Sequence, residues 1–260
     1  MIANSEHSPS SSEKDMNWKQ THALVTGGTR GIGRALVALL LEKGASVTAT
    51  GRTGASVDQA RLEFPGANWI VFDQSDEQQR SELVKRLQGK GVNLLIHNAG
   101  VQQLHDFTRE GEILQFNTEL ETAINFIGPV ELCRAMLPHM RDQEDARIVF
   151  VTSGLALAPK RSSPVYCANK AGLRSFAKSL RAQLHHAHWG IEVTEALPPL
   201  VDTDMTRGRG RGKISAQSAA SQIVAGIQAG KPEIYVGASA LLRVISRISP
   251  ALAEAIMINR

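Results

Sequence analysis

Cysteine is scarce in this sequence. The two cysteines, Cys133 and Cys167, lie far apart, with no CxxC pair and no Cys/His ligand spacing. The sequence therefore indicates neither a disulfide framework nor a structural zinc site, and we expect no metal. Such cysteine usage is typical of a protein from a reducing compartment.

Long apolar runs are also missing. The stretch 238–258 is interrupted by Arg243, Arg247 and Pro250, and residues 1–20 contain no apolar core. The sequence therefore predicts neither a membrane span nor a secretory signal. We expect a cytoplasmic protein that does not bind membranes.

Neither sign of charge dominates the chain. Lys and Arg number 29 against 25 Asp and Glu, a net charge of +4 for 260 residues. This excess is small, so a surface of interspersed charges explains it better than nucleic-acid binding does. Hydrophobic residues make up 42% and charged residues 21%, which excludes a collagen, a coiled coil and a wholly disordered chain.

The first residues differ in composition from the rest. Residues 1–17 are Ser-rich and polar without an apolar period, so they cannot offset the entropy of ordering, and we expect a disordered tail. No repeat of fixed period and no Pro/Ser linker interrupts the remainder. Residues 18–260 are therefore expected to form a single domain.

Strand and helix patterns alternate within this domain. Seven short runs predict strands: THALVTGG, ASVTATGR, NWIVFD, VNLLIHNAG, ARIVFVTS, IEVTEALPP and EIYVG. Helical patterns lie at residues 32–44, 76–90, 116–141 and 163–184. Several strand runs are continuously apolar, as strands covered by helices on both faces require. The sequence thus predicts an α/β fold with a Rossmann-like, doubly wound parallel sheet.

A glycine-rich turn follows the first predicted strand. It reads Thr26-Gly27-Gly28-Thr29-Arg30-Gly31-Ile32-Gly33 and opens the first helix, where backbone N–H groups can meet a pyrophosphate. Glycine suits this place because a Cβ would block the phosphates or clash in the turn. The spacing G-x3-G-x-G departs from the usual dinucleotide fingerprint, and a purely structural tight turn is the alternative.

The turn TGGTRGIG resembles the TGxxxGxG signature of the short-chain dehydrogenase/reductase (SDR) family, and the resemblance extends over residues 21–236. Further family marks stand in family order: Asn98-Ala99-Gly100, Asn125, Ser153 and Tyr166-x-x-x-Lys170. Such an ordered set on a matching strand and helix pattern leaves little room for coincidence. The resemblance implies a nicotinamide-dependent oxidoreductase.

Two arginines bear on the choice of dinucleotide. Where NAD-preferring Rossmann proteins place an acidic side chain after the second strand, this chain has Gly51 and Arg52. Arg30 stands where NADP-preferring SDR members often carry a basic residue. Two arginines near one phosphate favour NADP(H) through charge-assisted bonds, although a solvated strand-end or turn arginine would explain either one alone.

The resemblance implies further cofactor contacts. Asp73 resembles the carboxylate that contacts the adenine amino group, with a helix N-terminal acid as the alternative. Asn98 is implied beside the adenosine ribose, with a polar strand-end cap as the alternative. The Val201 backbone and the Thr203 hydroxyl match positions that bond the nicotinamide carboxamide. The predicted cofactor-binding residues are Gly27, Thr29, Arg30, Gly31, Ile32, Gly33, Arg52, Asp73, Asn98, Ala99, Gly100, Tyr166, Lys170, Val201 and Thr203.

Four residues are the predicted catalytic group. Tyr166 and Lys170 are four apart in a helical stretch, which places both on one helix face. A phenol with a pKa of ~10 needs help at neutral pH, which an ammonium and an oxidised nicotinamide supply by favouring the phenolate. By resemblance, Tyr166 exchanges the proton and Lys170 lowers its pKa and binds the nicotinamide ribose. Ser153 bonds the substrate oxygen and Asn125 holds a water beside the lysine, unless it bonds nearby backbone instead.

The sequence departs from the family after the sixth predicted strand. Pro198-Pro199 replaces the usual Pro-Gly, which puts any contact that used that glycine in doubt. The Arg-Gly segment 207–213 follows, within a substrate lid expected at about residues 203–216. It is interpreted as a solvated flexible loop, a lid attracting an anionic substrate, or an RGG-type nucleic-acid contact. Because it lacks aromatic residues, we expect no nucleic-acid partner.

The C-terminal stretch 239–258 has apolar residues at helical spacing and predicts an amphipathic helix. Such a helix closes the pocket, packs on a partner subunit or touches a membrane, and packing is the commonest role. The leading hypothesis is an NADP(H)-dependent homodimeric or homotetrameric enzyme interconverting a small-molecule carbonyl and a secondary alcohol. The alternative is a cofactor-binding regulator or scaffold of SDR fold with little turnover.

Overall fold

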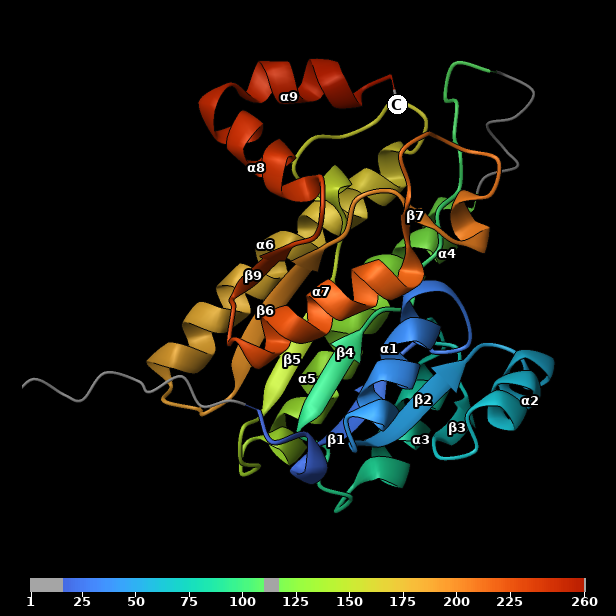
Figure 1. Cartoon of the computed structure of the whole chain (residues 1–260), viewed down its shortest axis with the longest axis vertical. Helices are drawn as coiled ribbons and strands as arrows, with labels where there is room; N and C mark the ends of the chain where they lie inside the picture. Colours follow the sequence, from blue (N-terminus) through green and yellow to red (C-terminus); the bar gives the residue numbers. More distant parts are fainter. Residues whose placement is uncertain (1–15, 110–116, 260) are drawn as a thin grey trace, which may run out of the picture.

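The computed structural model describes residues 16–109 and 117–259 (Figure 1). All but the last two residues of the predicted tail lie outside these ranges. Met16 and Trp18 are both buried in the core, and the Gln228 side chain donates to the Met16 carbonyl (3.4 Å). Met16, within the predicted disordered tail 1–17, is therefore part of the packed core.

Seven parallel strands form the central sheet, in the order β3-β2-β1-β4-β5-β6-β9. In chain order they are β1 (His22–Val25), β2 (Ser46–Gly51), β3 (Asn68–Val71), β4 (Leu94–His97), β5 (Arg147–Val151), β6 (Glu192–Leu197) and β9 (Glu233–Tyr235). All the pairings are parallel, which confirms the predicted Rossmann-like fold. The strand order reverses between β1 and β4, and ligands bind at the carboxyl ends of strands at such a point.

Helices cover both faces of the sheet (Figure 1). One face carries α1 (Gly31–Glu42), α2 (Gly54–Glu63) and α7 (Ala216–Gln228), and the other carries α3 (Glu77–Leu87), α5 (Gly128–Met140) and α6 (Pro164–His186). Successive strand residues serve opposite layers: Val149 joins the first core, whereas Ile148 and Phe150 join the second. This alternation explains why the strand runs are continuously apolar.

Two helical regions differ from the sequence-based prediction. α2 was not predicted, because it buries only Val57 and Ala60 and shows almost no apolar stripe; Thr53 caps its start. The stretch predicted as one helix over 116–141 is α4 (Thr118–Thr122), a π-helix (Ala123–Ile127) and α5, with residue 116 outside the described ranges. A π-helical turn widens the helix locally and often marks a functional site.

The C-terminal stretch forms a helical hairpin. α8 (Ser239–Ile248) and α9 (Pro250–Met257) replace the single helix expected over 239–258. The break falls at Ser249, whose extended backbone ends α8 and whose hydroxyl caps α9, because Pro250 cannot continue the first helix. The hairpin packs Leu242 and Ala253 against Ala158, on the segment between β5 and α6.

A small second sheet frames the segment predicted to be a substrate lid. β7 (Val201–Asp202) pairs with β8 (Ile214–Ser215), so the two ends of the segment 203–213 between them lie close together. Within the described ranges, no helix combines the length and the apolar character needed to cross a membrane.

Candidate active site

The glycine turn between β1 and α1 is built for close approach. Gly27 has a left-handed backbone (φ +66°), and a Cβ added there would lie 2.8 Å from the Ala99 Cα. A Cβ on Gly33 would collide with the Gly27 carbonyl and the Asn98 amide. Backbone alone fits here, so N–H groups at the start of α1 are available to an anion. The predicted residues on this turn are Gly27, Thr29, Arg30, Gly31, Ile32 and Gly33.

Asn98 holds the turn against the end of β4. Its side-chain amide donates to the carbonyls of Thr26 (3.0 Å) and Gly27 (3.1 Å). The Thr26 hydroxyl in turn accepts from the backbone N–H groups of Asn98 and Ala99, both at 3.1 Å. The sequence motif Asn98-Ala99-Gly100 therefore fixes the geometry of the glycine turn from the neighbouring strand.

Asn125 lies in the π-helix and braces the segment after Gly100. Its side chain accepts from the Val101 N–H (2.9 Å) and donates to the Val101 carbonyl (2.7 Å). The point where Gly100 would carry a Cβ is 3.0 Å from Asn125 Oδ1 and 3.5 Å from Lys170 Nζ. The structure thus brings the predicted residues Gly100, Asn125 and Lys170 together at one place.

Lys170 and Tyr166 project from the same face of α6 and are both buried. Lys170 Nζ donates to the Val151 carbonyl (2.9 Å) and lies 5.7 Å from the centre of the Tyr166 ring. Burial lowers the pKa of the Lys170 ammonium to about 8. A lysine whose pKa lies this close to neutral pH is suited to taking part in proton transfer beside the phenol.

Ser153 follows β5 and faces Tyr166. Its hydroxyl caps a short 3-10 turn by accepting from the Leu155 N–H (3.1 Å) and hydrogen-bonds the Tyr166 phenol. Burial raises the pKa of this phenol above its usual value, and the Ser153 hydrogen bond only partly offsets the rise. In the protein alone the phenol is therefore protonated at neutral pH, opposite in direction to the phenolate activation expected from the sequence.

Val201 and Thr203 lie at the start of the predicted lid, near the first turn of α1. Val201 is buried in β7, and Thr203 lies against Gly31: a Cβ on that glycine would be 3.0 Å from the Thr203 methyl carbon. The first turn of α1 and the start of the lid are therefore neighbours. Pro198, just before the unusual Pro199, accepts the Gly154 N–H (2.9 Å) and so ties the end of β6 to the Ser153 turn.

Arg30 and Arg52 are exposed, beside the start of α1 and just after the end of β2. Among the residues that the structure describes, neither pairs with a carboxylate, whereas the nearby Arg34 pairs with Glu63. Asp73 is engaged locally, since its carboxylate accepts from the Ser75 N–H (2.9 Å) and hydroxyl (2.6 Å).

Sequence comparisons place this site among known proteins. A family model described as short chain dehydrogenase matches residues 21–213. The uncharacterized oxidoreductase DltE of Bacillus subtilis (strain 168) is 37% identical over 228 residues, which cover 84% of this chain and 89% of that protein. The chain belongs to the short-chain dehydrogenase family. The 3-oxoacyl-[acyl-carrier-protein] reductase FabG of Escherichia coli (strain K12) is 32% identical over 203 residues, covering 74% and 78% of the two chains.

A solved short-chain dehydrogenase has the same architecture. The enzyme from Burkholderia cenocepacia J2315, in complex with NADP, matches with a TM-score of 0.83 at 26% identity, covering 94% of this chain and 100% of that one. The resemblance seen in the sequence motifs is therefore confirmed for both family and fold.

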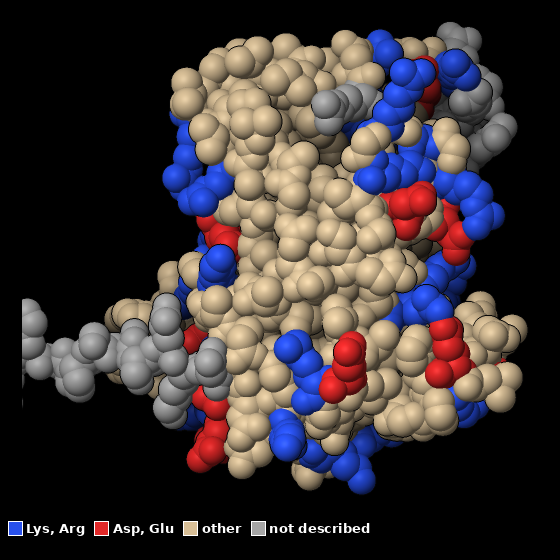
Figure 2. Space-filling view, in the orientation of Figure 1, with Lys and Arg blue, Asp and Glu red and all other residues tan. Residues whose placement is uncertain are grey.

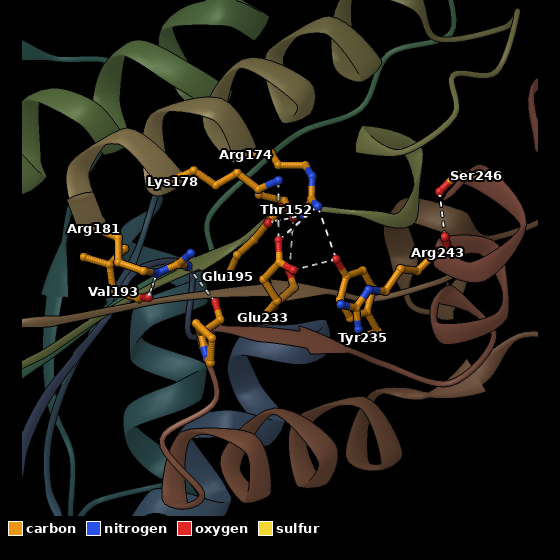
Figure 3. Close-up of polar contacts among 12 residues, drawn as sticks. Thr152, Arg174, Lys178, Arg181, Val193, Glu195, Glu233, Tyr235, Arg243 and Ser246 are labelled. Carbon is orange, nitrogen blue, oxygen red and sulfur yellow. Dashed lines mark hydrogen bonds and ion pairs between the residues drawn. The ribbon is translucent and has the colours of Figure 1, made fainter. Parts of the chain in front are cut away.

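Behind the short-chain dehydrogenase site lies a polar network that the sequence motifs did not reveal (Figure 3). The fully buried Glu195 of β6 accepts from the Thr152 hydroxyl (2.6 Å) and forms an ion pair with Arg174. Arg174 also pairs with Glu233 (3.0 Å) and donates to the Tyr235 hydroxyl (3.2 Å). Burial raises the pKa of the Glu195 carboxyl, against the opposing influence of Thr152 and Arg174.

This network connects the elements that carry the catalytic group. Thr152 directly precedes Ser153, and Arg174 lies one helical turn beyond Lys170 on α6. Arg243 of α8 stacks over the Tyr235 ring, 4.5 Å from its centre (Figure 3). The only sequence signal was the position of Arg174, four residues after Lys170 and thus on the same helix face.

Two buried histidines near the site were also missed. His105 Nε2 lies 2.7 Å from a Glu121 oxygen, and both side chains are fully buried. Glu121 also accepts the Gln103 N–H (3.2 Å), so the pair anchors the segment after Gly100 to α4. His97, just before Asn98, stacks on Phe150 with ring centres 4.8 Å apart, and burial lowers its pKa to about 3, so it is neutral.

Proposed function

We propose that this short-chain dehydrogenase is an NADP(H)-dependent oxidoreductase that interconverts a carbonyl and a secondary alcohol. The observation that carries the proposal is the convergence of the Ser153 hydroxyl, the Tyr166 phenol and the Lys170 ammonium next to the glycine turn. A hydrogen-bond donor, a proton donor and a cation are what a carbonyl oxygen needs as it gains negative charge.

The chain offers a place for the dinucleotide. The glycine turn is packed so closely that a Cβ on Gly27 or Gly33 would clash with neighbouring protein atoms, and such a turn before a helix N-terminus suits a pyrophosphate. Arg30 and Arg52, without carboxylate partners among the described residues, suit a 2′-phosphate and support NADP(H) over NAD(H). The Burkholderia relative binds NADP, which agrees with this choice. When bound, the nicotinamide supplies or accepts the hydride.

In carbonyl reduction, the Tyr166 phenol donates its proton to the substrate oxygen. Burial keeps that proton on the phenol at neutral pH, so the group is ready to act as an acid. The Ser153 hydroxyl hydrogen-bonds the same substrate oxygen and stabilises its developing charge. The Lys170 ammonium stabilises the phenolate left behind, and Asn125 holds the segment after Gly100 beside the lysine.

Beyond the chemistry, we propose that the protein acts in the cytoplasm as a homodimer or homotetramer on a small molecule. The absence of CxxC pairs in the sequence and the lack of a membrane-crossing helix in the described ranges agree with this setting. Light scattering of the purified protein measures its assembly state directly.

The test compares the full-length protein with Tyr166→Phe, which keeps the ring and removes the hydroxyl. NADPH oxidation with a panel of ketones and aldehydes is followed by the nicotinamide absorbance, and NADPH binding by its fluorescence. We expect kcat to fall by about two to four orders of magnitude while NADPH affinity stays near that of the wild type. Binding of NADPH by the wild type without oxidation of any substrate would instead support a regulator or scaffold.

A further inference from the structure

The basic residues of the predicted lid, about residues 203–216, fall into two groups. Arg207 pairs with Asp204, and Lys213 pairs with Asp202 (3.3 Å). Arg209 and Arg211 have no carboxylate partner among the described residues. Arg211 is exposed, whereas Arg209 is half-buried. Figure 2 shows Lys and Arg side chains gathered where Figure 1 draws this segment.

Arg209 is directed across the mouth of the active site. Its guanidinium donates to the Gln102 side chain (3.3 Å), which belongs to the segment after the Asn98-Ala99-Gly100 motif. The turn around it is fixed: Arg209 N–H donates to the Thr206 carbonyl (3.0 Å), and Gly210 has a left-handed backbone (φ +66°) against Leu200. The Arg209 charge also acts on Tyr166, where it opposes the rise in the phenol pKa.

A second cation, Lys160, lies close enough to Arg209 for the two charges to interact. It belongs to the segment between β5 and α6, and its N–H donates to the sulfur of Cys167, the residue after Tyr166 (3.4 Å). Lys160 is half-buried, and both burial and the nearby Arg209 lower its pKa. Within the described ranges it forms no ion pair with a carboxylate either, and the buried carboxylate of Glu121 is engaged by His105.

Two half-buried cations that repel each other are unfavourable unless an anion joins them. The dinucleotide phosphates do not account for this pair. The glycine turn and the arginines at positions 30 and 52 provide for those phosphates. The Arg209 charge instead acts on the Tyr166 phenol and on Lys160, whose backbone N–H is bonded to Cys167, the residue after Tyr166.

We propose that Arg209 and Lys160 bind an oxyanion group, a carboxylate or a phosphate, carried by the carbonyl substrate. Gln102 orients the guanidinium, and the two cations hold the anion while the carbonyl points to Tyr166 and Ser153. The inference rests on the proposed function and narrows its substrate class to anionic carbonyl compounds.

The experiment measures binding of matched acids and esters to the full-length protein saturated with NADP+, by calorimetry and without turnover. The probes are acetoacetate with ethyl acetoacetate, and 4-acetylbenzoate with its methyl ester. The variants are R209Q and K160Q, and the matched control is R211Q, which removes the same charge from the exposed neighbour. R209K retains the charge and tests for rescue.

We expect R209Q to weaken binding of the acids by about ten- to a hundredfold, as loss of a charged hydrogen bond predicts. K160Q should act in the same direction, R209K should restore part of the affinity, and R211Q should change it by less than about twofold. Ester affinity should not respond to any of these variants. A salt series should weaken the acids alone.

Three outcomes overturn the inference: no saturable binding of either acid, equal affinity for acid and ester, or equal effects of R209Q and R211Q. The last would mean that lid charge acts from a distance without a defined site. NADPH oxidation is measured separately. Acid-selective binding in a protein that never oxidises NADPH would reject the proposed function and keep the anion site.

Discussion

Two regions around the predicted active site use the same charged residue types in opposite ways. One is the buried network of Thr152, Arg174, Glu195, Glu233 and Tyr235, which we call the floor, and the other is the predicted lid. On the floor, Arg174 and Glu195 are largely withdrawn from water, with 14% and 0% of their side chains exposed. In the lid, the pair of Arg207 with Asp204 has 82% and 52% of the two side chains exposed. The comparison teaches that exposure, and not the presence of an ion pair, decides what each arginine contributes to stability.

The largest effect is expected on the floor, from Arg174→Met. This change leaves the Glu195 carboxylate buried without its cation, which should lower the free energy of unfolding by about 3–5 kcal/mol. Urea denaturation followed by circular dichroism measures it. Adding Glu195→Met to Arg174→Met should recover much of the loss, because no unpaired buried charge then remains. If Arg174→Met were as stable as the wild type, the buried ion pair of the floor would contribute no more to the free energy of unfolding than the exposed pair of the lid.

An exposed arginine gains importance when its partner is a ligand, and Arg52→Asp tests this. Replacing the cation beside the predicted 2′-phosphate should weaken NADPH binding by about 1.5–3 kcal/mol, as for a charged hydrogen bond. NADH, which lacks that phosphate, should bind nearly as before. Fluorescence titration of both nucleotides gives the two affinities, and an equal loss for both would remove Arg52 from the phosphate site.

Burial of Lys170, one helical turn before Arg174 on α6, should also appear in the pH profile of NADPH oxidation. Burial lowers the pKa of Lys170 to about 8, so the ammonium prevails below that pH and is lost as the pH rises through it. NADPH oxidation should therefore fall by about tenfold per pH unit once the pH exceeds this value. A stopped-flow profile of the reductive step measures it. A rate that stays flat up to the ordinary lysine pKa would show that Lys170 is not the titrating group.

The smallest effect is expected in the lid, from Asp204→Asn. The exposed pair with Arg207 contributes about 0–1 kcal/mol, so the free energy of unfolding should hardly change. The same urea experiment serves as the measurement, with Arg174→Met as its counterpart. A loss as large as that of the floor variant would abolish the distinction between the two regions.

Local patterns made much of the molecule predictable from its sequence. The seven strands follow from short apolar runs, and the glycine turn and the Tyr166/Lys170 pair follow from fixed spacings on adjacent elements. Features set by distant partners were not predictable. The π-helix around Asn125 depends on close packing of Gly128 against the Gln74 backbone, and Glu195 meets Thr152 across 43 residues.

The same reasoning explains two of the three helical regions that differ from the prediction, α2 and the C-terminal stretch. α2 has too little apolar periodicity to be detected, and its position follows from the Thr53 cap and from packing of Val57. The C-terminal stretch kept its apolar spacing across the break, so periodicity alone did not reveal that Ser249 and Pro250 divide it.

The helical hairpin formed by α8 and α9 lies directly on the segment that carries Ser153. A Cβ on Gly154, next to Ser153, would be 2.9 Å from the Ser239 hydroxyl, and the Arg161 N–H donates to the Ile258 carbonyl (2.9 Å). Residues 239–258 are thus held against the segment that carries Ser153. Substitutions in this short stretch can change the surroundings of that serine while Tyr166 and Lys170 keep their places on α6.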